Sequence, residues 1–319
     1  MNHNLTVSYS PHIRAKITSS RIMLDVILAL CPALIAAVLI FGLRAALVVG
    51  VTVASCVFFE WGYQKLAKKS TTVKDLSAVV TGVLLAFNLP VSIPLWQAVF
   101  GSAVAIILVK QLFGGIGKNF ANPAITARVV MLISFPVAKT TWDYVSGIAS
   151  NAISAATPHA VSGATPLELI SRGDLDALPS LFDMFLGTRM GCLGETSAIA
   201  LLIGGAYLLI RRVITWHIPV TFIGTVFVLT AILGEQPTYQ LMAGGLLLGA
   251  FFMATDYPTS PQTSKGRIIF GIGCGLLTVL IRVYGSYPEG VSFAILFMNV
   301  LVPFINKLSM TKALGGVKK

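Results

Sequence analysis

Charged residues are scarce in this sequence of 319 residues. Asp, Glu, Lys and Arg together make up 11% of it, whereas apolar residues make up 55%. A soluble domain carries roughly 25% charged residues, so this chain has too few charges to cover the surface of a soluble protein. Disorder requires the opposite composition, low hydrophobicity with high charge. The mean hydropathy of +0.84 therefore indicates a membrane protein with several spans.

Cysteine and histidine are also rare, with four of each. The cysteines form no CxxC pair, which excludes an iron–sulfur cluster or a disulfide framework of the usual spacing. The histidines share no ligand spacing, so we expect no metal site. The sequence also lacks a nicotinamide-binding fold. Its first 21 residues are polar, and the apolar run after them is too long for a signal peptide.

Ten apolar stretches, dense in Leu, Ile, Val, Ala and Gly, fill most of the remaining chain. A helix satisfies its own backbone hydrogen bonds in lipid. We therefore predict an all-α polytopic membrane protein with about ten transmembrane helices. The stretches cover residues 22–41, 45–62, 76–89, 94–109, 123–135, 195–210, 218–233, 241–254, 268–283 and 290–304.

The basic residues predict the orientation in the membrane. With the N-terminus inside, 17 of the 23 Lys and Arg residues lie in inside segments, five lie outside, and Arg128 lies within a span. The positive-inside rule then places both termini in the cytoplasm and the acidic segment 136–194 outside. The net charge of +11 is thus explained without a nucleic-acid partner.

The chain also repeats itself weakly, because TGVLLAFNLP (81–90) resembles GGLLLGAFFMATDYP (244–258). Five spans per half is an odd number, so the two five-helix repeats must be inverted. Inverted repeats usually hold a binding site at their interface, beside short or broken helices. Stretches three, five, eight and ten have only 13 to 15 residues, fewer than the ~17 of a full span, and we expect their ends to line such a site.

These observations divide the chain into five predicted parts. They are a cytoplasmic N-terminal segment (1–21), a first membrane repeat (22–135), an extracytoplasmic loop (136–194), a second membrane repeat (195–306) and a basic cytoplasmic tail (307–319).

The Gly-rich segment 114–124 (GGIGKNFANPA) is the most unusual stretch near a membrane face. Asn119 and Asn122 are three positions apart and could face one ligand. Pro123 could open a short helix whose free N–H groups favour an anion or a carbonyl. Arg128, one turn later, would need a partner or a cavity at membrane depth. The alternative is a turn that satisfies only its own backbone.

Acidic residues beside the short helices are candidates for ion coupling. They are Asp75, Asp256 and Glu195, and we place Asp75 and Asp256, which border short helices, above Asp25 and Glu60. The alternative for each is a paired acid at a helix end.

The outer loop contains Ser162-Gly163-Ala164-Thr165, followed by Pro166 and Glu168. This order predicts a helix that begins with Thr165 as its N-cap. Apolar residues at helical spacing over 166–186 predict that this helix lies on the membrane surface.

Six ordered blocks of the chain resemble the family that contains the D subunits of Rnf complexes and, more distantly, the B subunits of sodium-pumping NADH:quinone reductases. The blocks are SPHIR (10–14), GGIGKNFANPA (114–124), SGATPL (162–167), GCLGETS (191–197), MATDYPTSP (253–261) and YPEGVSFAIL (287–296). The resemblance implies a fold similar to that of urea channels.

The resemblance also implies two flavins. One is FMN, bound covalently by a phosphoester at Thr165, which ends the Ser162-Gly163-Ala164-Thr165 block. The second is a non-covalent riboflavin between the halves on the cytoplasmic side, for which Lys118, Asn119, Asn122 and Arg128 are the candidate contacts. His159 departs from the family pattern, in which the residue three before the Ser is usually acidic.

The implied function is that of a membrane component of an ion-translocating ferredoxin:NAD oxidoreductase. With the A, B, C, E and G subunits of such a complex, it would pass electrons across the membrane and couple them to Na⁺ or H⁺ movement. The chain would then be part of a translocase, without catalytic residues of its own. Two other interpretations stay open at this point: a solute channel or secondary transporter with inverted repeats, and a membrane anchor whose flavin segment has decayed.

Overall fold

The computed structural model describes residues 18–135, 164–285 and 290–310. The described parts of the chain are helical and contain no strand, which confirms the all-α prediction. Ser162, Gly163 and His159 of the predicted flavin segment lie outside the described residues.

The first half of the molecule comprises the helices up to residue 134. They are α1 (Ser19–Phe41), α2 (Leu43–Leu66), the 3₁₀ turn η1 (Val73–Asp75), α3 (Ser77–Phe87), α4 (Leu95–Ala103), which continues as the π-helix η2 (Val104–Gln111), and α5 (Pro123–Ser134).

The second half begins at α10. It comprises α10 (Ala198–Ile210), α11 (His217–Ile232), α12 (Pro237–Met242), α13 (Leu246–Leu248), which continues as the π-helix η4 (Gly249–Met253), the 3₁₀ turn η5 (Tyr257–Thr259), α14 (Ser264–Tyr284) and α15 (Val291–Ser309). Between the halves lie α8 (Pro166–Arg172), the 3₁₀ turn η3 (Leu175–Ala177) and α9 (Leu181–Leu186).

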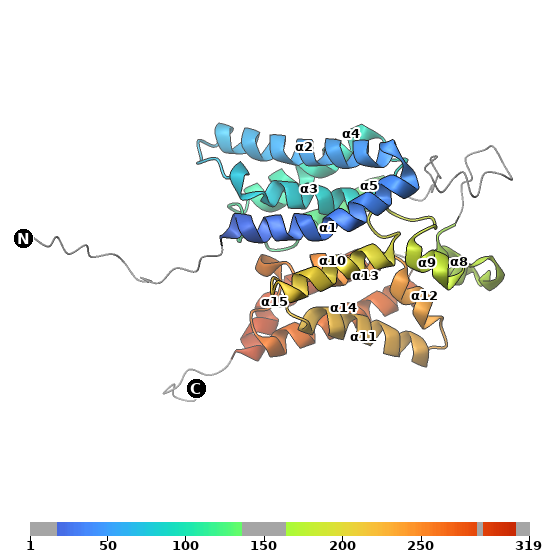
Figure 1. Ribbon diagram of the computed structural model, residues 1–319. Helices are drawn as coiled ribbons and strands as arrows, with labels where there is room; N and C mark the ends of the chain where they lie inside the picture. Colours follow the sequence, from blue (N-terminus) through green and yellow to red (C-terminus); the bar gives the residue numbers. More distant parts are fainter. Residues whose placement is uncertain (1–17, 136–163, 286–289, 311–319) are drawn as a thin grey trace, which may run out of the picture.

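The two halves lie against each other along their helices (Figure 1). Contacts between them include α1 with α10 and α5 with α15. Helix α1 begins and α15 ends at one end of the molecule, which we call the terminal end. Helices α8, α9 and α12 gather at the opposite end (Figure 1). The two ends carry the two groups of residues described below.

Four helices in the described residues are long and apolar enough to cross a membrane: α1, α2, α14 and α15. Five shorter apolar helices accompany them, at Ser77–Phe87, Leu95–Gln111, Pro123–Ser134, Ala198–Ile210 and His217–Ile232. The prediction that the last stretch (290–304) is a short helix is wrong. Helix α15 has 19 residues, because Asn306 and Lys307 extend the helix beyond the apolar run.

The predicted single surface helix over 166–186 is also wrong. Helix α8 ends at Arg172, because Gly173 adopts the left-handed conformation (φ 82°) that favours glycine. Helix α9 begins only at Leu181, after Pro179. The apolar spacing was compatible with one helix, but these two residues interrupt it.

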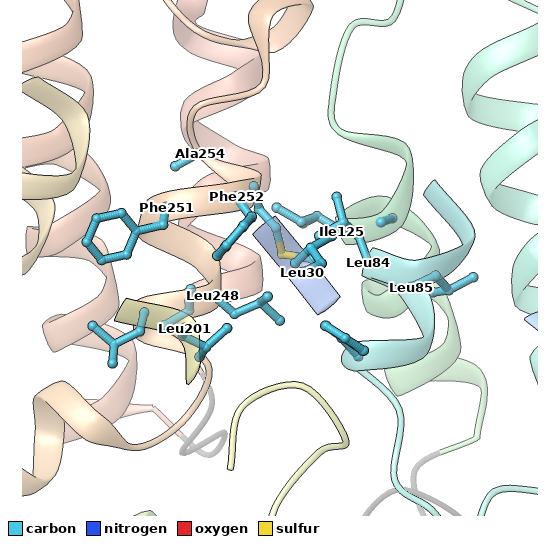
Figure 2. Close-up of a cluster of buried hydrophobic side chains, with 14 of the residues drawn as sticks. Leu30, Leu84, Leu85, Ile125, Leu201, Leu248, Phe251, Phe252 and Ala254 are labelled. Carbon is cyan, nitrogen blue, oxygen red and sulfur yellow. The ribbon is translucent and has the colours of Figure 1, made fainter. Parts of the chain in front are cut away.

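A hydrophobic core joins the two halves. Figure 2 shows Leu30, Leu84 and Ile125 of the first half beside Leu248 and Phe252 of the second. Leu30, Ile125 and Leu248 are at most 1% exposed, so the halves are packed against each other without a solvent layer at this level.

Candidate functional site

A pocket lies between the two halves at the terminal end, and we call it the central pocket. It contains about 780 Å³ of space, part of which is open to solvent. Its walls are mostly apolar, with polar groups from Ser77, Lys110, Asn119, Asn122, Asp256 and Tyr257. The pocket therefore combines the apolar lining and the few polar groups typical of a ligand site.

Two of the predicted flavin contacts, Asn119 and Asn122, line this pocket. Asn122 is the N-cap of α5, where its Oδ1 accepts hydrogen bonds from the N–H groups of Ala124 and Ile125 at 3.0 and 3.3 Å. Its Nδ2 donates to the Met253 carbonyl of η4 at 3.3 Å, so it also ties the two halves together. Asn119 is different, because its Oδ1 is buried and has no hydrogen-bond partner among the described residues.

The other two predicted riboflavin contacts do not line the central pocket. Lys118 is exposed. Arg128 is 5% exposed and donates to the Asn88 carbonyl at the end of α3 and to Cys192 Sγ at 3.3 Å. Arg128 thus faces the segment that follows α9, on the side away from the pocket.

Asp75 and Asp256, the two acids ranked first for ion coupling, lie on or beside the pocket. Asp256 lines it and accepts a hydrogen bond from Thr259 Oγ1 at 3.2 Å. Asp256 lies in the connection after η4, and burial raises its pKa to about 6. Asp75 accepts hydrogen bonds from the Ser77 N–H, at 2.8 Å, and from the Ser77 hydroxyl, and Ser77 lines the pocket.

A buried ion pair next to the pocket was not predicted from the sequence. Lys110 Nζ lies 2.6 Å from Glu60 Oε2, and the two side chains are 2% and 0% exposed. Lys110 Nζ also donates to Ser77 Oγ at 2.6 Å. The sequence signal was a lone Glu inside span two and a Lys directly after span four, but nothing in the sequence pairs residues 50 positions apart.

Three buried arginines gather toward the α8–α9 end, and we call them the arginine cluster: Arg128, Arg189 and Arg282. They are 5%, 4% and 7% exposed. Glu195, 6% exposed, is the buried acid near them. Its carboxylate accepts a hydrogen bond from the Cys192 N–H at 2.9 Å. The cluster therefore places more positive than negative charge in the described interior.

The arginines of the cluster hold turns of the backbone. Arg189 donates to the carbonyls of Thr196 and Glu195, at 3.1 and 2.6 Å, and to that of Met242. Arg282 donates to the carbonyls of Gln240 and Ala243 at 2.7 and 2.9 Å. Charged donors satisfy buried carbonyls strongly, so these side chains fix the broken connection between α12 and α13.

Thr165 lies at the same end, and its predicted role as a helix cap is confirmed. Its Oγ1 accepts a hydrogen bond from the Glu168 N–H at 3.3 Å, and the residue is 7% exposed. A small cavity of about 200 Å³ beside it is lined also by Arg189, Glu195 and Gly244. Thr165 and Glu195 are thus near each other, whereas the other candidate acids lie by the central pocket.

No cluster of His, Cys, Asp and Glu suited to a metal ion occurs in the part of the chain that the structure describes. The four cysteines, all of which lie in described segments, form no disulfide.

Comparison with known proteins gives a match over almost the whole chain. The model of the NQR2, RnfD, RnfE family matches residues 6–315. The chain is 49% identical to the D subunit of the Na⁺-translocating ferredoxin:NAD⁺ oxidoreductase complex of Acetobacterium woodii, over 99% of this chain and 96% of that protein. It is 43% identical to the D subunit of the proton-translocating ferredoxin:NAD⁺ oxidoreductase complex of Clostridium ljungdahlii, over 97% and 96%. It is 41% identical to the D subunit of the ion-translocating oxidoreductase complex of Stutzerimonas stutzeri, over 92% of each chain.

Proposed function

The chain belongs to the NQR2, RnfD, RnfE family, and from this we propose that it is the D subunit of an ion-translocating ferredoxin:NAD⁺ oxidoreductase. In this proposal it is a membrane component of a translocase that works with the other Rnf subunits, and it passes electrons between two flavins, one toward each end of the molecule. The terminal end faces the cytoplasm, and the α8–α9 end faces the outside, as the distribution of Lys and Arg indicates. The two halves are inverted five-helix repeats. Support for the repeat comes from the pairing of α1 with α10 and of α5 with α15.

FMN is attached to Thr165 through a phosphoester in this proposal. Thr165 ends the Ser162-Gly163-Ala164-Thr165 block. The surroundings support an anionic group there, because Arg189 lines the same cavity and Arg282 donates to Gly244, another residue of its wall. A phosphoester carries negative charge, and a hydrogen bond from a charged donor such as a guanidinium group to an anion is strong.

Riboflavin binds non-covalently in the central pocket in this proposal. The mostly apolar walls suit a flat ring. The buried Asn119 Oδ1, which has no partner in the described residues, suits a ring N–H donor, because an unpaired buried acceptor is unfavourable. Phe251 and Phe252 of η4 supply apolar wall, and Asn122 fixes the pocket by joining the halves. A bound flavin ring supplies reversible electron acceptance, and the residues of this chain hold and enclose it.

Cation coupling is assigned to Asp256 in this proposal, with Asp75 beside it. Charge added to a buried site interacts strongly with nearby ions, because the local dielectric constant is low. A carboxylate on the pocket wall can therefore take up a cation or a proton when the charge in the pocket changes. In the assembled complex, Asp256→Asn should abolish ion transport while the chain remains assembled. Unchanged pumping in this variant would refute the assignment.

The flavin proposal rests on Thr165, which ends the Ser162-Gly163-Ala164-Thr165 block. In-gel fluorescence tests whether flavin is attached there. The full chain is expressed with a flavin transferase, denatured and illuminated. We expect a fluorescent band that disappears in Thr165→Ala and persists in Thr188→Ala, a threonine of the same end that hydrogen-bonds only Asp183 among described side chains. A dark band in the unmodified chain would refute FMN attachment and favour an anchor or a channel.

A further inference from the structure

The Glu60–Lys110 pair lies at the junction of three elements and reaches the central pocket. Glu60 comes from α2, Ser77 from the start of α3, and Lys110 from the π-helix η2. Lys110 and Ser77 both line the pocket, whereas Glu60 lies behind them. A π-helix is rare and frequently marks a functional site. Here it places a lysine in the wall of a mostly apolar pocket, next to Ser77.

Burial of this ion pair costs free energy, because both charges are removed from water. Both ions are at most 2% exposed, and a buried pair is often no more stabilising than apolar residues of the same volume. Lys110 also uses only two of its three N–H donors in the hydrogen bonds to Glu60 and Ser77 that the described residues provide. The third N–H donor of Lys110, a residue of the pocket wall, has no partner among the described residues.

The pair is also connected to the surface. Glu60 Oε1 accepts hydrogen bonds from the Thr72 hydroxyl at 3.1 Å and from Gln64 Nε2 at 3.4 Å. Thr72 is exposed. The polar contacts thus run from solvent through Thr72 and Glu60 to Lys110 and the pocket. Asp256 faces the same pocket from the other half.

We propose that Lys110 is the charge-balancing residue of the central pocket and that Glu60 holds it there. An electron that enters the pocket without a proton adds one negative charge. The Lys110 ammonium stabilises that charge, whereas the Glu60 carboxylate opposes it. The two residues therefore shift the reduction potential of the bound ring in opposite directions, Lys110 upward and Glu60 downward. This inference rests on the proposed riboflavin site.

The opposite effects expected of Lys110 and Glu60 on the reduction potential give the test. Lys110→Met removes a positive charge and should lower the midpoint potential of the pocket flavin. Glu60→Gln removes a negative charge and should raise it. The double variant should lie between the two single variants. For each single variant we expect a change of about tenfold in the ratio of reduced to oxidised ring at fixed poise, which is about 59 mV for a one-electron couple. Lys110→Arg keeps the charge and serves as the matched control.

The measurement uses the full chain carrying Thr165→Ala, so that only non-covalent flavin remains. Flavin released on denaturation is counted per chain, and the visible absorbance of the intact protein is followed in a spectroelectrochemical titration. No released flavin in the parent chain would refute the pocket as a flavin site, and this inference with it. If both variants bind flavin at full occupancy but Lys110→Met and Glu60→Gln do not shift the potential in opposite directions, only this inference is refuted, and the flavin site stands. If Lys110→Met loses its flavin, the upward shift in Glu60→Gln decides the question, and an unshifted potential there overturns the proposal.

Discussion

The contact between α1 and α10 leaves no room for a side chain at Gly204. A Cβ built on Gly204 would lie 2.1 Å from the Ala29 carbonyl oxygen and 3.0 Å from Phe252 Cζ. The first of these atoms belongs to the backbone of α1 and cannot rotate away. Small residues allow this close approach between membrane helices. Gly204→Ala should therefore push α1 and α10 apart at the junction of the two halves.

The size of the effect follows from two opposing contributions. Alanine is favoured over glycine inside a helix by up to ~1 kcal/mol, whereas overpacking a tight interface costs about 1–3 kcal/mol. Gly224 of α11 is the matched control, because a Cβ there would meet no atom within 4 Å. Gly224→Ala should keep the gain without the clash. The propensity gain is common to both variants, so we expect them to differ by the overpacking cost of about 1–3 kcal/mol in unfolding free energy.

Thermal unfolding in detergent measures this difference. Cys56, Cys192 and Cys274 are buried thiols, so a thiol-reactive dye reports the loss of the fold. Gly204→Ala should unfold below the unmodified protein, and Gly224→Ala at or above it. If Gly204→Ala proved as stable as Gly224→Ala, the close approach of α1 to α10 would be incorrect.

Two further predictions concern the ends of the molecule. Arg282→Gln should lower the unfolding free energy by about 2 kcal/mol or more, because buried carbonyls of the α12–α13 connection lose charged donors. Arg267→Gln, whose partners are more exposed, should lower it less. Equal losses in thermal unfolding would contradict the role of Arg282 in fixing the α12–α13 connection. Burial raises the pKa of Asp256 to about 6, so the folded protein favours its protonated form. Its contribution to stability is then present at acidic pH and is lost as the pH rises through about 6. Melting curves across pH should show that Asp256→Asn lacks this loss of stability. If the variant kept the same pH profile as the unmodified protein, Asp256 would not be its cause.

Local patterns predicted much of the architecture. Helix occurs in each of the ten apolar stretches, and Thr165 caps α8 as its sequence context predicted. Asn122 likewise caps α5, although its amide group also joins the two halves. These features depend on residues within a few positions of each other, which a single sequence displays.

Contacts between distant residues were not predictable in the same way. Glu60 and Lys110 lie on different helices, and the apolar pattern placed Lys110 in a loop as a surface cation. Arg282 satisfies carbonyls about 40 positions earlier, a relation that no spacing rule contains. The break between α8 and α9 was visible in Gly173 and Pro179, but the regular apolar spacing argued against it. Local sequence patterns therefore predicted the helices and their caps, whereas tertiary packing determines which charged side chains contact each other.

If FMN is attached at Thr165 as proposed, the position of this residue imposes an order on the maturation of the protein. Its hydroxyl is bonded to the Glu168 N–H, and the residue is 7% exposed where α8 packs near α12. A modifying enzyme would need that oxygen before α8 settles into place. Under that proposal, attachment would have to precede docking of α8, and a chain that docked first would stay unmodified. Folding speed at this one end would thus set how much of the protein becomes functional.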